Sequence, residues 1–287
     1  MLKINGYSKI NLSLDVLSKR EDGYHNLQMI MQSLELHDEI TLERISSGIV
    51  IDCNAMYVPA NSSNIAYKAA EMMIRENALS CGVKISIKKN IPVAAGLAGG
   101  STDAAAVIKG MNSMLGLNKS QQELMMLGKT IGADVPYCIM GGTALAEGIG
   151  ERLTKLKPLS NIPVILVKPR IGVSTAWVYG NLNISEIKDR PQTDRLIEAV
   201  NTQDIKFISK NMKNVLESVT IKKYSIINDI KERLVKLGAS GSMMSGSGPT
   251  VFGIFEDKQM AESAFNSLKH SEHECILTQM YSYTDAI

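Results

Sequence analysis

Apolar and polar residues alternate over residues 2–16, which predicts a half-buried β-strand near the start of the chain. One face of this strand would carry the apolar side chains of Ile10, Leu12, Leu14 and Val16. The opposite face would carry the polar side chains of Lys9, Asn11 and Ser13. The strand is thus expected to be apolar on one side and polar on the other.

The rest of the first half is predicted to mix strands with helices. Strands are expected at residues 28–36, 39–43, 49–52 and 83–88, and a helix at residues 65–77. This alternation indicates a mixed α/β fold.

Helical spacing becomes strongest after residue 100. Apolar side chains recur on one face from Ala104 to Leu115, which predicts a helix over residues 101–115. Ser120 followed by Glu123 forms a capping box, so the next helix is expected to begin there and to end near Gly132.

A stretch from Lys155 to Pro163 that contains two prolines is the predicted domain boundary. The segments predicted beyond it are a strand at 164–167, helices at 194–200, 205–212 and 226–237, strands at 241–244 and 250–255, a helix at 258–268 and a strand at 275–281. The sequence therefore predicts an α/β (α+β) fold with two domains, residues 1–157 and 158–287.

Composition and charge narrow the class of protein. The chain has 287 residues, of which 45% are hydrophobic and 21% are charged, so we expect a folded protein with a buried core. Its 31 basic and 29 acidic side chains leave a net charge of +2, which implies neither a nucleic-acid partner nor a membrane surface. No apolar run is long enough for a membrane span, and no signal peptide is evident, so we expect a cytoplasmic protein.

The cysteines do not suggest a disulfide framework or a zinc site. Cys53, Cys81, Cys138 and Cys275 are scattered without a CxxC spacing, and buried thiols are the favoured interpretation. Near the C-terminus, residues 269–275 place carboxylates and a thiol beside two histidines, which would be compatible with a metal site. No known ligand spacing is met there, so a solvated polar turn is favoured.

A loop of small residues leads directly into the helix predicted from residue 101. The residues of this loop are Pro92, Val93, Ala94, Ala95, Gly96, Leu97, Ala98, Gly99, Gly100, Ser101 and Thr102. Small side chains let backbone N–H groups approach an anion, and a helix N-terminus adds donors and partial positive charge. A phosphate site is predicted; the alternative is a tight turn in which Ser101 or Thr102 merely caps the helix. Neither GxxxxGK[ST] nor a Rossmann GxGxxG is present.

This loop, together with two further motifs, resembles the superfamily of galactokinase, homoserine kinase, mevalonate kinase and phosphomevalonate kinase. Residues 8–12 are similar to the N-terminal strand motif of the superfamily, and residues 241–252 to its C-terminal glycine-rich motif. Many members carry glycine where Ala94, Ala95 and Ala98 stand. Alanine would still let phosphates reach the backbone, provided that these positions do not need a positive φ.

The resemblance implies a two-domain kinase with its active site in the cleft between domains, using ATP and Mg²⁺. It also implies that Lys9 and Asp134 are catalytic, which fits a reaction that needs charge stabilisation and a proton acceptor. Without the motifs, Lys9 would be interpreted as a solvated strand lysine and Asp134 as a loop or cap residue. No metal ligands are predicted, and the oligomeric state is left open.

Two segments, residues 20–28 and 132–136, resemble the members of this superfamily that phosphorylate a cytidine-diphosphate-linked polyol in the non-mevalonate isoprenoid pathway. The resemblance implies that Asn11, Tyr24 and His25 recognise the cytidine, with Tyr179 as a further candidate for stacking. Each is also compatible with an ordinary structural role. Asn64 is compatible with a place near the adenine or with helix capping.

Two other functions remain open at this point. One is a kinase of the same superfamily that acts on mevalonate, homoserine or a sugar, against which residues 22–25 argue. The other is a kinase-like protein that binds nucleotide without turnover, against which the presence of both Lys9 and Asp134 argues.

Overall fold

The computed structural model describes residues 1–282, whose contacts divide the chain into two compact units. The first unit comprises residues 1–8, 36–93 and 98–141. The second comprises residues 9–35, residues 94–97 and the chain from residue 142 onward. Two long strands and the small-residue loop pass from one unit to the other, which makes both units discontinuous in sequence. The boundary between residues 157 and 158 stays a prediction.

The sheet of the first unit is built around β4 (Gly82–Lys88). On one side β4 pairs antiparallel with the second half of β2 (His25–Ile45), so that Glu39 lies opposite Lys88. On the other side it pairs parallel with β3 (Ile49–Cys53). The first residues of β1 (Leu2–Lys19) also belong to this unit.

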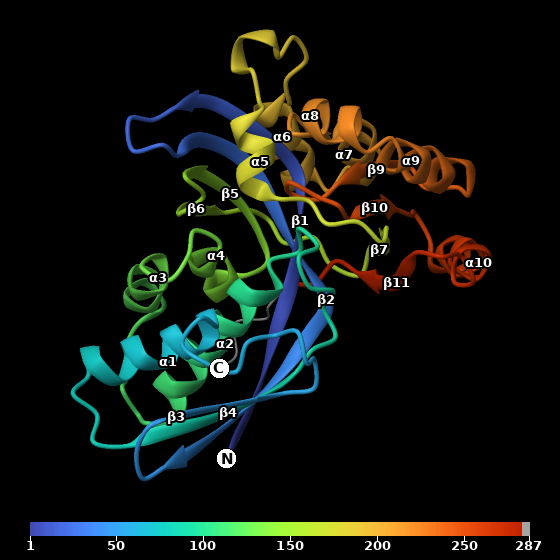
Figure 1. The fold of residues 1–287 in the computed structure, drawn as a ribbon. Helices are drawn as coiled ribbons and strands as arrows, with labels where there is room; N and C mark the ends of the chain where they lie inside the picture. The colour runs from blue at the N-terminus through green and yellow to red at the C-terminus, as the bar shows by residue number, and fades with distance from the viewer. Residues whose placement is uncertain (283–287) are drawn as a thin grey trace. The chain divides into compact units, whose positions relative to one another are not determined.

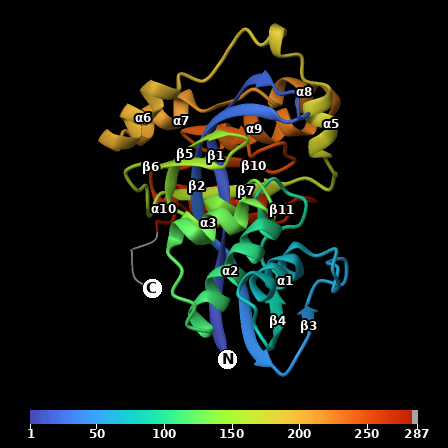
Figure 2. The same cartoon turned by 90° about the vertical axis from the view of Figure 1, so that its left-hand side faces the viewer.

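Helices cover one face of this sheet in both views (Figures 1 and 2). They are α1 (Ile65–Glu76), α2 (Gly99–Met114), α3 (Gln121–Lys129) and α4 (Val135–Met140). The helix α2 packs against both α1 and α4. The predicted capping box is confirmed at α3, where the Ser120 hydroxyl accepts from the Glu123 N–H at 3.3 Å and the Glu123 carboxylate accepts from the Ser120 N–H at 2.8 Å.

The second unit contains the remaining halves of the two long strands. The first half of β2 pairs antiparallel with β5 (Thr143–Gly148). On its other side β5 pairs antiparallel with β6 (Arg152–Lys155). The second half of β1 pairs parallel with the two-residue strand β8 (Lys213–Asn214). In the order of this sheet β1, the strand that carries Lys9 and Asn11, lies between β2 and β8.

The second unit also contains a four-stranded antiparallel sheet, in the order β11-β7-β10-β9. Its strands are β7 (Pro163–Lys168), β9 (Gly241–Met244), β10 (Val251–Ile254) and β11 (Glu274–Gln279). Val251 of β10 lies opposite Val167 on one side and Met244 on the other. The turn between β9 and β10 is the C-terminal glycine-rich motif.

The helices of the second unit are α5 (Thr175–Gly180), the 3₁₀ helix η1 (Ile184–Glu186), α6 (Thr193–Thr202), α7 (Ile205–Asn211), α8 (Glu217–Lys223), α9 (Ile226–Lys236) and α10 (Lys258–Leu268). The helix α9 packs on β9 and β10, and α10 packs on β7 and β11. Leu234 and Phe252 are fully buried in this layer.

The predicted mixed α/β class is confirmed, but two details of the strands were wrong. The strand predicted to be half-buried is buried on both faces from Ser8 to Val16, because the polar positions are covered as well. The two strands predicted at residues 28–36 and 39–43 are one strand, β2. Asp38 does not interrupt it, because its carboxylate accepts backbone N–H groups from the segment that follows β4.

Three other expectations concern the cysteines, the polar cluster near the C-terminus and the absence of a membrane span. Among residues 1–282 none of the four cysteines forms a disulfide, but only Cys138 is buried, so the expectation of buried thiols was wrong for the other three. In the polar cluster at residues 269–275, residues 269–273 form the turn before β11 and the last two residues begin that strand. No helix in the described part of the chain has the length and apolar character to cross a membrane.

Candidate active site

Residues 94–97 of the small-residue loop are held by the glycine-rich turn between β9 and β10. The Ser245 hydroxyl donates to the Gly96 carbonyl at 2.9 Å, and the Thr250 N–H donates to the Ala95 carbonyl at 3.4 Å. Gly96 has a φ of +76°, and a Cβ there would lie 2.3 Å from the Ser245 carbonyl oxygen. Only glycine satisfies both the backbone conformation and this close approach.

Two of the alanines in the loop adopt the backbone conformation that glycine would favour. Ala94 has a φ of 52° and Ala98 a φ of 59°, whereas Ala95 does not have a positive φ. The condition under which alanine would be unstrained therefore fails at Ala94 and Ala98. Left-handed residues other than glycine cluster at functional sites, where surrounding structure maintains them.

The helix α2 begins directly after Ala98, which is its N-cap. Among the described residues no side chain caps this helix. The alternative in which Ser101 or Thr102 is the cap was wrong, because both lie inside the helix and the Thr102 hydroxyl donates to the Tyr7 carbonyl at 2.7 Å. The first N–H groups of α2 can therefore serve an anion.

Lys9 is buried, with 5% of its surface exposed, although it is charged. Its backbone N–H donates to the Leu97 carbonyl at 3.2 Å, which joins β1 to the small-residue loop. Its Nζ donates to Asn11 Oδ1 at 3.0 Å, and a Cβ at Gly246 would be 3.6 Å from this Nζ. The interpretation of Lys9 as a solvated strand lysine is therefore wrong.

Asn11 is also fully buried on β1. Its Oδ1 accepts from Lys9, and its Nδ2 donates to the sulfur of Met29 at 3.2 Å. Asn11 thus fixes the direction of the Lys9 ammonium from one side. A buried ammonium with a fixed direction is a suitable group for stabilising anionic oxygens.

Asp134 is the residue before α4 in the first unit, and it is half-buried. Its side chain makes no capping hydrogen bond to that helix, in contrast to the capping role that we considered. Pro136 in the first turn of α4 restricts the backbone next to it. The carboxylate is therefore held at a rigid helix start without being used to cap it.

Two of the predicted recognition residues, His25 and Tyr179, lie together in the second unit. Their ring centroids are 5.1 Å apart, with an angle of 32° between the ring planes. Burial, helped by the positive charge of Lys19, lowers the pKa of His25. The imidazole is therefore neutral at pH 7, which leaves one ring nitrogen as an acceptor.

Tyr24 occupies the turn between β1 and β2, and 59% of its surface is exposed. The turn is closed by the Arg20 N–H, which donates to the Tyr24 carbonyl at 2.8 Å, and by Asp22, which accepts from the Tyr24 N–H at 3.1 Å. An exposed ring on a closed turn presents its face to a ligand at little cost in entropy.

Several contacts that hold the glycine-rich turn were not predicted from the sequence. Asn214 is buried, and its Nδ2 donates to the carbonyls of Met244 at 2.9 Å and of Gly246 at 2.8 Å. The hydroxyls of Thr175 and Ser247 are 2.8 Å apart, which ties α5 to the same turn. The bond between Gly248 and Pro249 is cis. Asn214 and Thr175 are far from the turn in sequence, and no local pattern indicates these contacts.

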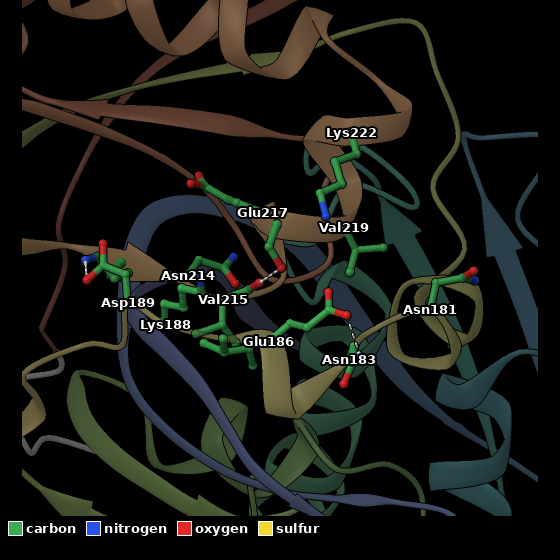
Figure 3. Close-up of a pocket in the computed structure, with 13 residues that line it drawn as sticks. Asn181, Asn183, Glu186, Lys188, Asp189, Asn214, Val215, Glu217, Val219 and Lys222 are labelled. Atoms are coloured by element: carbon green, nitrogen blue, oxygen red, sulfur yellow. Dashed lines mark hydrogen bonds and ion pairs between the residues drawn. The ribbon is translucent and has the colours of Figure 1, made fainter.

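A pocket of about 400 Å³ lies beside Asn214 in the second unit (Figure 3). Asp189 and Lys213 on its wall form an ion pair, and Glu217 accepts from the Met244 N–H at 2.8 Å. None of the site residues predicted from the sequence lines this pocket.

Asn64 has a structural role in the first unit. It is the N-cap of α1, its Oδ1 accepts from the Ala66 N–H at 2.9 Å, and its Nδ2 donates to the Pro59 carbonyl at 2.8 Å. Capping therefore accounts for the bond that its Oδ1 accepts, and its Nδ2 joins the cap to the preceding loop.

Comparison with known families matches both halves of the chain. Residues 64–142 match the family described as GHMP kinases N terminal domain, and residues 196–273 match the family described as GHMP kinases C terminal. The first match includes the small-residue loop, and the second includes the glycine-rich turn.

Curated relatives match almost the whole chain. A protein of Acetivibrio thermocellus described as 4-diphosphocytidyl-2-C-methyl-D-erythritol kinase is 57% identical over 278 residues, which cover 97% of this chain and 98% of that protein. A protein of Clostridium botulinum with the same description is 52% identical and covers 97% of this chain and 99% of its own length.

Solved structures agree with these relatives. A crystal structure described as 4-(cytidine 5'-diphospho)-2C-methyl-D-erythritol kinase superposes with a TM-score of 0.85 at 29% identity, covering 98% of this chain and all of that one. A homoserine kinase from Cytophaga hutchinsonii superposes with a TM-score of 0.76 at 17% identity, covering 98% of this chain and 94% of its own. The second likeness concerns the fold alone.

Proposed function

The chain belongs to the GHMP kinases and, within them, to the 4-diphosphocytidyl-2-C-methyl-D-erythritol kinases, and from this membership we propose that it phosphorylates that compound with ATP. The observation that carries the proposal is the 57% identity over 97% of the chain. The reaction belongs to the non-mevalonate route to isoprenoids. A cytoplasmic location is part of the proposal, because ATP and a nucleotide-linked acceptor are too polar to cross a membrane unaided.

The small-residue loop and the start of α2 hold the phosphates of ATP in this proposal. The N–H groups of Gly99, Gly100 and Ser101 have no side-chain cap, and the helix adds partial positive charge at the same end. Within the described residues, the buried hydroxyl of Thr250, in the glycine-rich turn, has no hydrogen-bond partner. Each feature leaves hydrogen bonds that a ligand can complete.

Lys9 and Asp134 carry the chemistry in this proposal. A hydroxyl oxygen of the acceptor attacks the γ-phosphorus of ATP, the new P–O bond forms, and the bond to the oxygen that bridges the β- and γ-phosphates breaks. The hydroxyl proton passes to the carboxylate of Asp134, and ADP leaves with the bridging oxygen. The Lys9 ammonium, oriented by Asn11, stabilises the negative charge on the transferred group.

Mg²⁺ is the proposed metal ion, and it would arrive with the nucleotide. In residues 1–282 no three His, Cys, Asp or Glu side chains come together as a group that could hold a metal ion. Mg²⁺ commonly takes one or two carboxylates, waters and the substrate phosphates instead. Bound in this way, it would supply positive charge that neutralises the phosphates.

The cytidine is recognised by aromatic side chains and a polar edge. His25 and Tyr179 provide adjacent rings, Tyr24 provides an exposed ring, and Asn11 supplies a buried amide. The neutral imidazole of His25 can accept from or donate to the base. These side chains are proposed to select a cytidine diphosphate over simpler alcohols.

The experiment that tests these roles measures turnover of purified protein with ATP, Mg²⁺ and 4-diphosphocytidyl-2-C-methyl-D-erythritol. We expect Asp134→Asn and Lys9→Ala each to lower kcat by on the order of a hundredfold, with the fold intact by circular dichroism. ADP release in a coupled assay is the readout.

Two controls match these variants. Asp257→Asn alters an aspartate that caps α10, and Lys236→Ala removes a lysine whose side chain is 78% exposed. Neither should change kcat, because neither belongs to the proposed site. Near-normal turnover of Asp134→Asn or Lys9→Ala would refute the role given to that residue.

A further inference from the structure

Three charged side chains form a buried cluster in the first unit. They are Asp38 of β2, Lys89 just after β4, and Asp103 of α2, and their side chains are 0%, 5% and 4% exposed. Lys89 Nζ is bonded to Asp38 Oδ2 and lies 2.8 Å from Asp103 Oδ2. One ammonium thus joins two carboxylates that lie on different elements.

The cluster fixes both ends of the small-residue loop within the first unit. Asp38 Oδ1 accepts from the backbone N–H groups of Asn90 at 2.6 Å and Ile91 at 2.9 Å, directly before the loop. Asp103 lies in α2, directly after the loop, and Lys89 connects the two carboxylates. A Cβ at Gly99 would be 3.2 Å from Ile91 Cγ2 and 3.3 Å from Lys89 Nζ, so the two ends are in close contact.

An apolar cluster of similar size would stabilise the fold at lower cost. Two carboxylates and one ammonium leave excess negative charge in a buried place, and in the described chain Asp103 Oδ1 has no hydrogen-bond partner. Burial raises the pKa of Asp103 well above its usual value, against the opposing effect of Lys89. Burial alone would lower the pKa of Lys89, but Asp103 and Asp38 together raise it.

We propose that Asp38, Lys89 and Asp103 are positioning residues that hold the two ends of the phosphate loop together. One end is residues 89–91, directly before the loop, and the other is the start of α2, directly after it. By holding these two ends, they keep the N–H groups of Gly99, Gly100 and Ser101 in the arrangement that the ATP phosphates require. The inference rests on the phosphate-binding role that the loop has in the proposed function. It adds three residues that act on ATP binding through the loop.

The test is the dissociation constant of ATP, measured by calorimetry on the full chain without acceptor. We expect Asp103→Ala to raise this constant on the order of tenfold, because α2 loses its tie to Lys89. Asp103→Asn keeps an oxygen acceptor of the same shape, so it should restore the affinity to within about threefold of wild type.

Two further variants separate positioning from stability. Val107→Ala truncates a fully buried side chain of the same helix and should lower the melting temperature without changing the affinity for ATP. The triple variant Asp38→Asn, Lys89→Met and Asp103→Leu removes all three buried charges and keeps an amide oxygen for the N–H groups of Asn90 and Ile91, so it should fold well. It should still bind ATP on the order of tenfold more weakly.

The outcomes distinguish this inference from the proposed function. A wild-type protein that binds ATP, together with a folded triple variant that binds it equally well, would overturn the positioning role and leave the kinase assignment standing. Loss of affinity in Val107→Ala as large as in Asp103→Ala would also overturn it, because the effect would then follow stability. A wild-type protein that does not bind ATP would overturn both.

Discussion

At the scale of single residues, His25 shows how burial prepares a group for recognition. Its ring lies 5.1 Å from the ring of Tyr179, and burial and Lys19 together lower its pKa. Protonation would place a charge where water is partly excluded and Lys19 already repels it. The neutral form is therefore favoured down to a lower pH than in a free histidine.

This lowered pKa predicts a pH dependence of acceptor binding. As the pH falls below the lowered pKa of His25, its imidazole becomes protonated and loses its acceptor nitrogen, so the KM for 4-diphosphocytidyl-2-C-methyl-D-erythritol should rise. The variant His25→Gln has no titratable group at this position. Its KM should be higher than that of wild type and should lack the rise with falling pH that His25 causes. The measurement is the KM for the acceptor between pH 5.5 and 8, at saturating ATP, for both proteins. If the KM rose equally with falling pH in the two proteins, this role for His25 would be excluded.

The sequence could indicate some of these residues but not their surroundings. Lys9 and Asn11 fall on one face of a strand by simple alternation, yet alternation cannot tell that this face is buried, because the covering residues Leu97 and Gly246 come from distant segments. The cluster of Asp38, Lys89 and Asp103 joins positions 51 and 14 residues apart. Each of its members resembles an ordinary surface charge in the sequence.

At the scale of elements, the junction between the loop and α2 is strained in a defined way. Ala98 is the N-cap of α2 in the left-handed conformation, with φ 59° and ψ 24°. The cost of this conformation for an L-residue is about 1–2 kcal/mol, whereas glycine avoids it but loses about 0.5–1 kcal/mol in chain entropy. The balance favours glycine by a small margin.

Ala98→Gly should therefore raise the free energy of unfolding by about 0.5–1 kcal/mol. Ala95→Gly is the matched control: Ala95 is buried and lacks a positive φ, so its replacement should lower stability. Urea titration of both variants beside wild type is the measurement. If Ala98→Gly proved as destabilising as Ala95→Gly, the strain at this junction would be excluded.

Long elements with a clear period were predictable, and short ones were not. The capping box at Ser120 and the apolar face of α2 predicted their helices within a few residues. The six-residue helices α4 and α5 were missed, because so few residues give no period. The strands β5 and β6 were also missed, and their places are fixed by pairing with β2 rather than by their own pattern.

At the scale of the whole molecule, similarity extends across both units. The N-terminal family covers residues 64–142 and the C-terminal family covers residues 196–273. The relatives at 57% and 52% identity cover 97% of the chain, so the assignment does not rest on one motif. The substrate distinguishes this family from the homoserine and mevalonate kinases that share its fold.

The most direct test of the whole account is a competition between acceptors in one reaction. Purified protein receives ATP and Mg²⁺ with equal concentrations of 4-diphosphocytidyl-2-C-methyl-D-erythritol, mevalonate, homoserine and galactose, and mass spectrometry identifies which compound gains a phosphoryl group. We expect only the cytidine compound to be phosphorylated, because a site built to hydrogen-bond the base rejects acceptors that lack it. Phosphorylation of mevalonate, homoserine or galactose while the cytidine compound stays unchanged would contradict the account.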